Sequence, residues 1–210
     1  MRPSDWIDPY RPAKGPPPDR LRPFLGWALT GAGGAIAVAM VVSALAGLTE
    51  TANAWVLGRV IDAVVGQGRA AFWTGANLPV LLMALGFFLV LRPVAFGLSN
   101  FMSSVVVAPA LAPMVTARLR RWLLTQSADF FDDDFAGRIA QKQAQTATAT
   151  TDLVIEGINT VTFVLASVVG AFVLVASIEP WLMPIFVLWL GAYAVTIRWF
   201  LPRIRLRSKA

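Results

Sequence analysis

The sequence predicts an all-α membrane protein with four long transmembrane helices that carry cytoplasmic extensions. Hydrophobic residues make up 57% of the chain and charged residues only 14%, whereas an ordinary globular domain is about a quarter charged. The charges are also segregated, because five long stretches carry none: residues 23–49, 70–91, 93–117, 157–178 and 180–197. Since a helix of about 20 apolar residues spans the hydrocarbon core of a bilayer, we expect these stretches to lie in lipid.

The amino-terminal part predicts an arm, a short interfacial helix and a first span. Residues 1–19 are rich in proline and predict an extended, disordered cytoplasmic arm. Residues 20–26 mix basic and apolar side chains, which is typical of a short helix at the membrane interface. The first span is predicted over residues 27–64. Small side chains recur along it every four positions, at Gly31, Ala35, Ala39, Ser43 and Gly47. Such a stripe favours close packing between helices in lipid.

Residues 78–126 are predicted as one long second helix. Two helices hinged at Arg92-Pro93 are the alternative, but these two residues leave no room for a turn outside the membrane. Proline inside a membrane helix is tolerated as a kink. Pro109 and Pro113 also lie in this helix, so we do not expect it to be straight. At 1.5 Å per residue the helix would be about 73 Å long, which is far more than a bilayer needs.

After a break at residues 129–137, a third helix is predicted over 138–178 and a fourth over 181–201, with a tight turn at Glu179-Pro180. Orientation follows from the basic residues, which favour the cytoplasmic side. With four spans and the amino terminus inside, fifteen of the eighteen basic residues lie on the inner side: before the first span, in residues 118–142 and after residue 197. Arg59 and Arg69 lie outside, and Arg92 lies in the membrane. Five spans would place one of the last two groups outside. Four spans are therefore predicted.

Two charged residues, Glu50 and Arg92, lie within the predicted spans. Charges at this depth are costly and tend to face a bundle interior or a water-filled cavity. Both residues lie roughly 18–21 Å from the outer ends of their helices, from the helix rise. The hypothesis is that they face each other and pair, either as a structural bridge or as part of a substrate-facing surface. The alternative is that the two charges occupy separate positions at the membrane interface. Asn53 and Asn100 are further candidate intramembrane polar residues.

The residue types in the chain limit the kinds of catalytic and metal sites that it can contain. The chain has no cysteine and no histidine, which excludes disulfides, thiolate chemistry and His/Cys metal sites. The basic residues follow the membrane topology, so nucleic acid is not an expected partner. No catalytic, cofactor-binding or metal-binding residue is predicted. A membrane enzyme is the weakest alternative, because it would rely on acids between Asp129 and Asp134, far from any pocket at lipid depth.

Three short segments resemble the first intracellular loop of ABC exporters: Arg118-Leu119-Arg120, Phe130-Phe131-Asp132 and Gly137-Arg138-Ile139. Asp152 stands where that family often has an acid. Residues 56–63 (VLGRVIDA) are similar to the end of the family's first helix, with Ala54 and Trp55 where a proline is usual. The resemblance covers residues from about Leu21 to the end. It implies the type I exporter fold of multidrug and lipid half-transporters, truncated after the fourth of six transmembrane helices.

By this resemblance, residues 131–138 form a coupling helix that rests on a nucleotide-binding domain. The expected contact residues are Phe130, Phe131, Asp132, Asp133, Asp134, Phe135, Gly137 and Arg138. The alternative is a solvated turn whose acids satisfy free N–H groups at a helix start.

The resemblance further implies ATP-driven efflux by alternating access, with ATP and Mg bound on a nucleotide-binding domain. The sequence has no G-x-x-x-x-G-K-[ST] motif, so we expect neither hydrolysis nor transport from this chain alone. In the family, spans four and five reach across to a second transporter half, in a homo- or heterodimer. A bacterial inner membrane with the amino terminus in the cytoplasm is the expected location. The alternative function is a self-contained four-span membrane scaffold or assembly protein whose cytoplasmic hairpin docks a partner.

Overall fold

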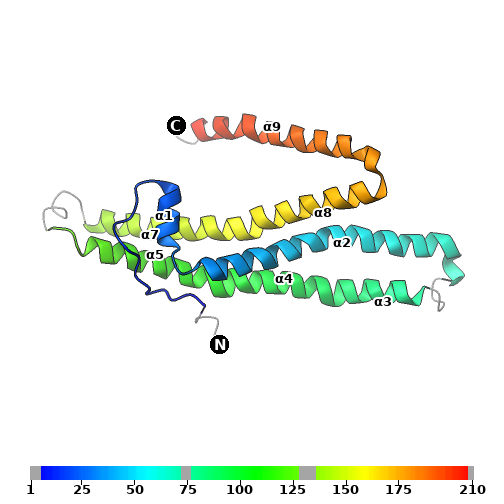
Figure 1. Cartoon of the computed structure of the whole chain (residues 1–210), viewed down its shortest axis with the longest axis horizontal. Coiled ribbons are helices and arrows are strands. Elements are labelled where there is room, and N and C mark those ends of the chain that lie inside the picture. Colours follow the sequence, from blue (N-terminus) through cyan, green and yellow to red (C-terminus); the bar gives the residue numbers. More distant parts are fainter. Residues whose placement is uncertain (1–5, 72–76, 128–135, 208–210) are drawn as a thin grey trace.

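The computed structural model describes residues 6–71, 77–127 and 136–207, and these residues contain helices but no strands. Four helical stretches are long and apolar enough to cross a membrane: Gly33–Gly66, Leu78–Leu123, Gly137–Ile178 and Pro180–Ile204. Figure 1 shows an elongated arrangement in which the first span lies beside both the second and the third. The predicted all-α fold with four spans is confirmed.

A short helix, α1 (Leu21–Ala28), precedes the first span, α2 (Gly33–Ala71). The chain turns between them at Gly31, whose φ of 91° suits glycine best. A Cβ at Gly31 would also lie 2.8 Å from the Cδ of Arg11. The predicted boundaries are corrected accordingly. Trp27 belongs to α1, and the first span begins only at Gly33. Helix α2 continues to Ala71, beyond the predicted end at residue 64.

The second span is one continuous rod made of α3 (Leu78–Gly86), η2 (Phe87–Leu91), α4 (Arg92–Phe101), η3 (Met102–Val107) and α5 (Ala108–Leu123). We call it the outgoing rod. Its two π-helical segments, η2 and η3, end just before Pro93 and Pro109. The N–H of Arg92 donates to Phe87 O and that of Ala108 to Ser103 O, one residue further back than in an α-helix. This wider turn makes room for a proline ring, which clashes with an α-helical carbonyl. The single long helix predicted over 78–126 is therefore present as far as Leu123.

The third span, which we call the returning rod, consists of α7 (Ala136–Glu156), η4 (Gly157–Thr162) and α8 (Phe163–Ile178), close to the predicted 138–178. Glu179 leaves the helix with φ −141° and ψ 90°. A 3₁₀ turn, η5 (Pro180–Leu182), then leads into α9 (Met183–Arg207). The predicted turn is thus confirmed, but the fourth helix passes through Pro202 and extends beyond residue 201. Figure 1 shows α9 folding back from that turn, away from the other spans.

The predicted stripe of small residues packs α2 against its neighbours. Ala35, Ala39 and Ser43 are at most 4% exposed. The Ser43 hydroxyl donates to the carbonyl oxygen of Ile158 at 2.6 Å. A Cβ on Gly47 would collide with the carbonyl oxygen of Phe163. The stripe is therefore confirmed from Ala35 to Gly47, whereas Gly31 lies in the turn before the helix.

The described part of the amino-terminal arm, residues 6–19, is anchored to the helices by one buried residue, which differs from the predicted disordered arm. Ile7 is 1% exposed and lies in a core cluster with Ala35 and Ala39 of α2 and Leu111 and Met114 of α5. Trp6, Ile7 and Tyr10 lie among prolines and form no helical period, so the sequence alone did not reveal this contact. The arm crosses α5 instead of extending away from the helices (Figure 1).

Candidate functional site

The part of the hairpin where α5 and α7 pack together is the candidate functional site. Helix α1 joins both of its helices. Ala28 of α1 lies in one cluster with Val115 of α5 and Ala147 of α7, and none of the three is more than 2% exposed. Phe24 and Trp27, with ring centroids 5.9 Å apart, pack against the same cluster. The interfacial helix therefore ties the outgoing and returning rods together at one level.

Arg118 holds α1 in this place. Its side chain is 2% exposed, and it lies on the buried face of α5 with Leu111, Met114 and Val115. The guanidinium donates four hydrogen bonds, all to backbone carbonyl oxygens: Arg11 (3.1 Å), Trp27 (2.9 Å), Ala28 (2.6 Å) and Thr30. Carbonyls at the end of a helix lack partners within it and form the negative end of the helix dipole. The buried cation is thus stabilised by carbonyl dipoles.

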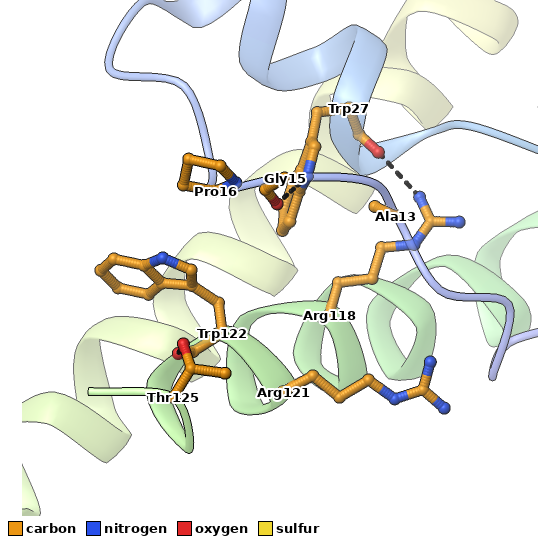
Figure 2. Close-up of a pocket in the computed structure, with 8 residues that line it drawn as sticks. All are labelled: Ala13, Gly15, Pro16, Trp27, Arg118, Arg121, Trp122 and Thr125. Carbon is orange, nitrogen blue, oxygen red and sulfur yellow. Dashed lines mark hydrogen bonds between the residues drawn. The ribbon is translucent and has the colours of Figure 1, made fainter. Parts of the chain in front are cut away.

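A cavity of about 370 Å³ lies beside Arg118, between the arm, α1 and α5. Its lining residues are Ala13, Gly15, Pro16, Trp27, Arg118, Arg121, Trp122 and Thr125. Figure 2 shows the Trp27 indole N–H donating to the carbonyl oxygen of Gly15, at 3.2 Å, and Arg121 pointing away from the two indoles. A second cavity, of about 510 Å³, is lined by Tyr10 of the arm and by Pro113, Arg120 and other residues of α5. The arm therefore touches α5 at separate points.

The predicted pair of membrane charges is present. An Nη2 atom of Arg92 lies 2.9 Å from Oε1 of Glu50, with the two side chains 35% and 34% exposed. The Arg92 guanidinium also lies 5.7 Å from the ring centroid of Phe96. Asn53 is half-buried, one turn after Glu50, and Asn100 is exposed. In the described part of the chain, neither amide side chain forms a hydrogen bond, so the two asparagines do not extend the pair into a network.

Most of the predicted coupling contacts lie outside the described residues: Phe130, Phe131, Asp132, Asp133, Asp134 and Phe135. Gly137 and Arg138 begin the returning rod, in the first turn of α7, and both are exposed. The coupling role of the tip, residues 129–137, therefore stays a prediction.

The role of Arg118 in fastening α1 was not predicted, although the sequence contains a signal for it. Leu111, Met114 or Val115, and Arg118 recur at the spacing of one helix face. A charge on an otherwise buried stripe requires polar partners. The spacing does not reveal that these partners are backbone carbonyls of a helix about 90 residues earlier, because only the tertiary fold brings α1 to α5.

Comparisons with known proteins agree with this architecture. The family model described as ABC transporter transmembrane region matches residues 36–210. A protein of Haemophilus influenzae, named an uncharacterized ABC transporter ATP-binding protein, is 26% identical over 208 residues. The match covers 97% of this chain but only 32% of that relative, so the chain spans about a third of its length. No solved structure gives a significant match. The family model covers most of the chain, and the chain therefore belongs to the ABC transporter transmembrane family.

Proposed function

We propose that this chain supplies the first four membrane helices of an ATP-driven exporter, and that its hairpin couples ATP hydrolysis on a nucleotide-binding domain to substrate efflux. The observation that carries the proposal is the length of the two rods. They have 46 and 42 residues, or about 69 and 63 Å at 1.5 Å per residue. This is roughly twice the 30 Å of the hydrocarbon core. Two joined rods of this length extend well beyond the lipid.

The packing of the rods supports their use as a lever. α5 and α7 lie against each other, and α1 ties them together through Val115 and Ala147. Threonine hydroxyls on α7 donate to carbonyls within their own helix, as Thr150 does to Thr146 O at 2.7 Å. The polar hydroxyls are thus satisfied within α7, which runs as one α-helix from Ala136 to Glu156. A push on the tip by a nucleotide-binding domain then moves both rods together.

Two features support the proposed partners. The relative from Haemophilus influenzae carries ATP binding in its name, and about two thirds of its length lies outside the match, which suits an attached nucleotide-binding domain. Helix α9 leaves the other spans after the turn at Glu179, and Leu188 on it is 76% exposed. A fourth span that departs in this way suits a contact with a second transporter half. We further propose a bacterial inner membrane location, with the arm and the tip in the cytoplasm.

The coupling contact is tested by photo-crosslinking. A photoreactive amino acid replaces Phe131 in the transporter that contains this chain and its nucleotide-binding domain, reconstituted in lipid vesicles. Crosslinking should occur to the nucleotide-binding domain, and its yield should change when ATP and vanadate trap the nucleotide. The same amino acid at Leu188, on exposed α9, is the control and should give no such product. Absence of the crosslink from Phe131 would contradict the coupling role.

Alternating access is tested with Asn53→Cys, which is the only cysteine in the chain because the sequence has none. An impermeant maleimide is applied from the outer side. If the membrane domain opens outward in the ATP-trapped state, labelling should rise by about fivefold or more on addition of ATP and vanadate. Glu179→Cys, in the exposed turn, should label equally with and without nucleotide. Labelling of Asn53→Cys that ignores nucleotide would argue against ATP-driven efflux.

A further inference from the structure

The amino-terminal arm contacts several elements of the molecule. Ile7 is inserted into the core between α2 and α5. The carbonyl oxygen of Arg11 accepts a hydrogen bond from Arg118, and that of Gly15 accepts one from Trp27. Cavities of about 370 and 510 Å³ adjoin the arm near these points. The hydrogen bond from Arg118 therefore ties the arm to α5.

Arg118 is common to three of the segments that meet here. Its four hydrogen bonds reach the arm at Arg11, the last turn of α1 at Trp27 and Ala28, and the turn before α2 at Thr30. Only an arginine offers five donors in a planar fork. A lysine offers one ammonium on a flexible stem, and from the position of α5 it cannot serve acceptors on three segments at once. The geometry is therefore specific to the guanidinium.

The segments that Arg118 joins connect the hairpin to the first span. α1 contacts both rods through Val115 and Ala147. Only residues 29–32 separate α1 from α2, and the N–H of Ala32 donates to Leu29 O within this short link. Displacement of the hairpin at the level of Arg118 is therefore delivered to the start of α2 through α1 and the link. The charge pair at Glu50 and Arg92 then joins α2 to the outgoing rod deeper in the membrane.

We propose that Arg118 is a positioning residue for coupling: it pins the arm, α1 and the α1–α2 turn to α5, so that hairpin movement drives the first span. This inference rests on the proposed function, since it describes how that movement reaches the membrane. Without the guanidinium, the carbonyls of Trp27, Ala28 and Thr30 lose their partner, and α1 can slide on the rods. The hairpin would then move without drawing α2 along.

The test measures nucleotide response and folding separately. Arg118→Ala and Arg118→Lys are introduced into the Asn53→Cys transporter with its nucleotide-binding domain. We expect both variants to hydrolyse ATP, while the rise in maleimide labelling with ATP and vanadate falls from about fivefold to less than twofold. The lysine variant should not rescue the response, because it keeps the charge but not the fork. Arg22→Ala, at an exposed arginine in the first turn of α1, is the control and should respond like the parent.

Arg118→Gln provides a second route, in case Arg118→Ala does not accumulate in the membrane. Glutamine fills part of the same space, but its one amide group offers two N–H donors in place of the five of the guanidinium, so the same loss of response is expected. A full labelling response in Arg118→Ala or in Arg118→Gln overturns the pin. No nucleotide response in the parent transporter overturns the proposed function instead, so the two failures are distinguishable.

Discussion

The ion pair between Glu50 and Arg92 joins the first two spans within the membrane. Reversal of either charge would place two like charges together in the bundle, and an unpaired charge at this depth costs about 2.5–3.5 kcal/mol. Glu50→Arg and Arg92→Glu should each lower the membrane yield and the thermal unfolding temperature, as measured by circular dichroism in detergent. The double variant should recover most of both. Asp62→Arg, a reversal at an exposed acid on the same helix, is the control and should change little.

Failure of the double variant to recover would mean that the two charges act separately.

The pairing could be inferred from the sequence, because helix rise places both residues at similar depth below the outer ends of their helices. The partners of Arg118 were not predictable in this way. A charge pair needs only matched heights on adjacent helices, whereas Arg118 bonds to carbonyls, which every residue possesses and which no pattern distinguishes.

At the scale of elements, the contact between α2 and α8 depends on glycine. A Cβ at Gly47 would collide with the Phe163 carbonyl, so Gly47→Ala should push the helices apart and cost about 1–3 kcal/mol through overpacking. Gly58 lies on the same helix, and a Cβ there would meet nothing within 4 Å. Gly58→Ala should therefore be neutral or stabilising, by up to about 1 kcal/mol. Thermal unfolding in detergent compares the two variants, and equal unfolding temperatures would contradict the close approach.

Helix boundaries were predictable where polar or turn-forming residues interrupt the apolar stretches. The break after the outgoing rod and the turn at Glu179-Pro180 carry strong local signals, and the structure places helix ends near both. The start of the first span was predicted six residues too early, because α1 and α2 share one uncharged stretch, residues 23–49. What separates them is the positive φ of Gly31 and the packing of Arg11 against it. Both depend on tertiary contact.

Prolines in the outgoing rod illustrate a different limit. The sequence predicted one continuous helix, kinked at Pro93 and not straight at Pro109 and Pro113. The structure has a π-helical segment just before each of Pro93 and Pro109, and the rod stays continuous. Pro113, inside α5, follows without a further segment. Proline predicts that an α-helical hydrogen bond is lost but not how the neighbouring turns respond, because that depends on the packing around them.

At the scale of the whole molecule, charge distribution predicted the number of spans, since a membrane imposes the same thickness on every helix. The contacts of the arm were not predicted, because its prolines and glycine indicate how stiff the backbone is but not which part of the protein it contacts. Ile7 is buried only because α2 and α5 leave a place for it between Ala35 and Met114. Composition therefore predicts which segments span the bilayer. It does not predict the contacts made by segments that lie outside regular helices.

The orientation of the whole molecule can be tested with two single cysteines, Ser127→Cys after the outgoing rod and Glu179→Cys in the turn before α9, both exposed positions. Since basic residues favour the cytoplasmic side, and Arg118, Arg120 and Arg121 lie close to Ser127 in sequence, an impermeant maleimide should label only Glu179→Cys in intact cells. In inverted membrane vesicles it should label only Ser127→Cys. Because the chain has no other cysteine, neither signal has a background within it. Labelling of Ser127→Cys from outside would place the hairpin on the side of the membrane that has no ATP, where no nucleotide-binding domain can drive it. That result would overturn the coupling mechanism but not the assignment to the family.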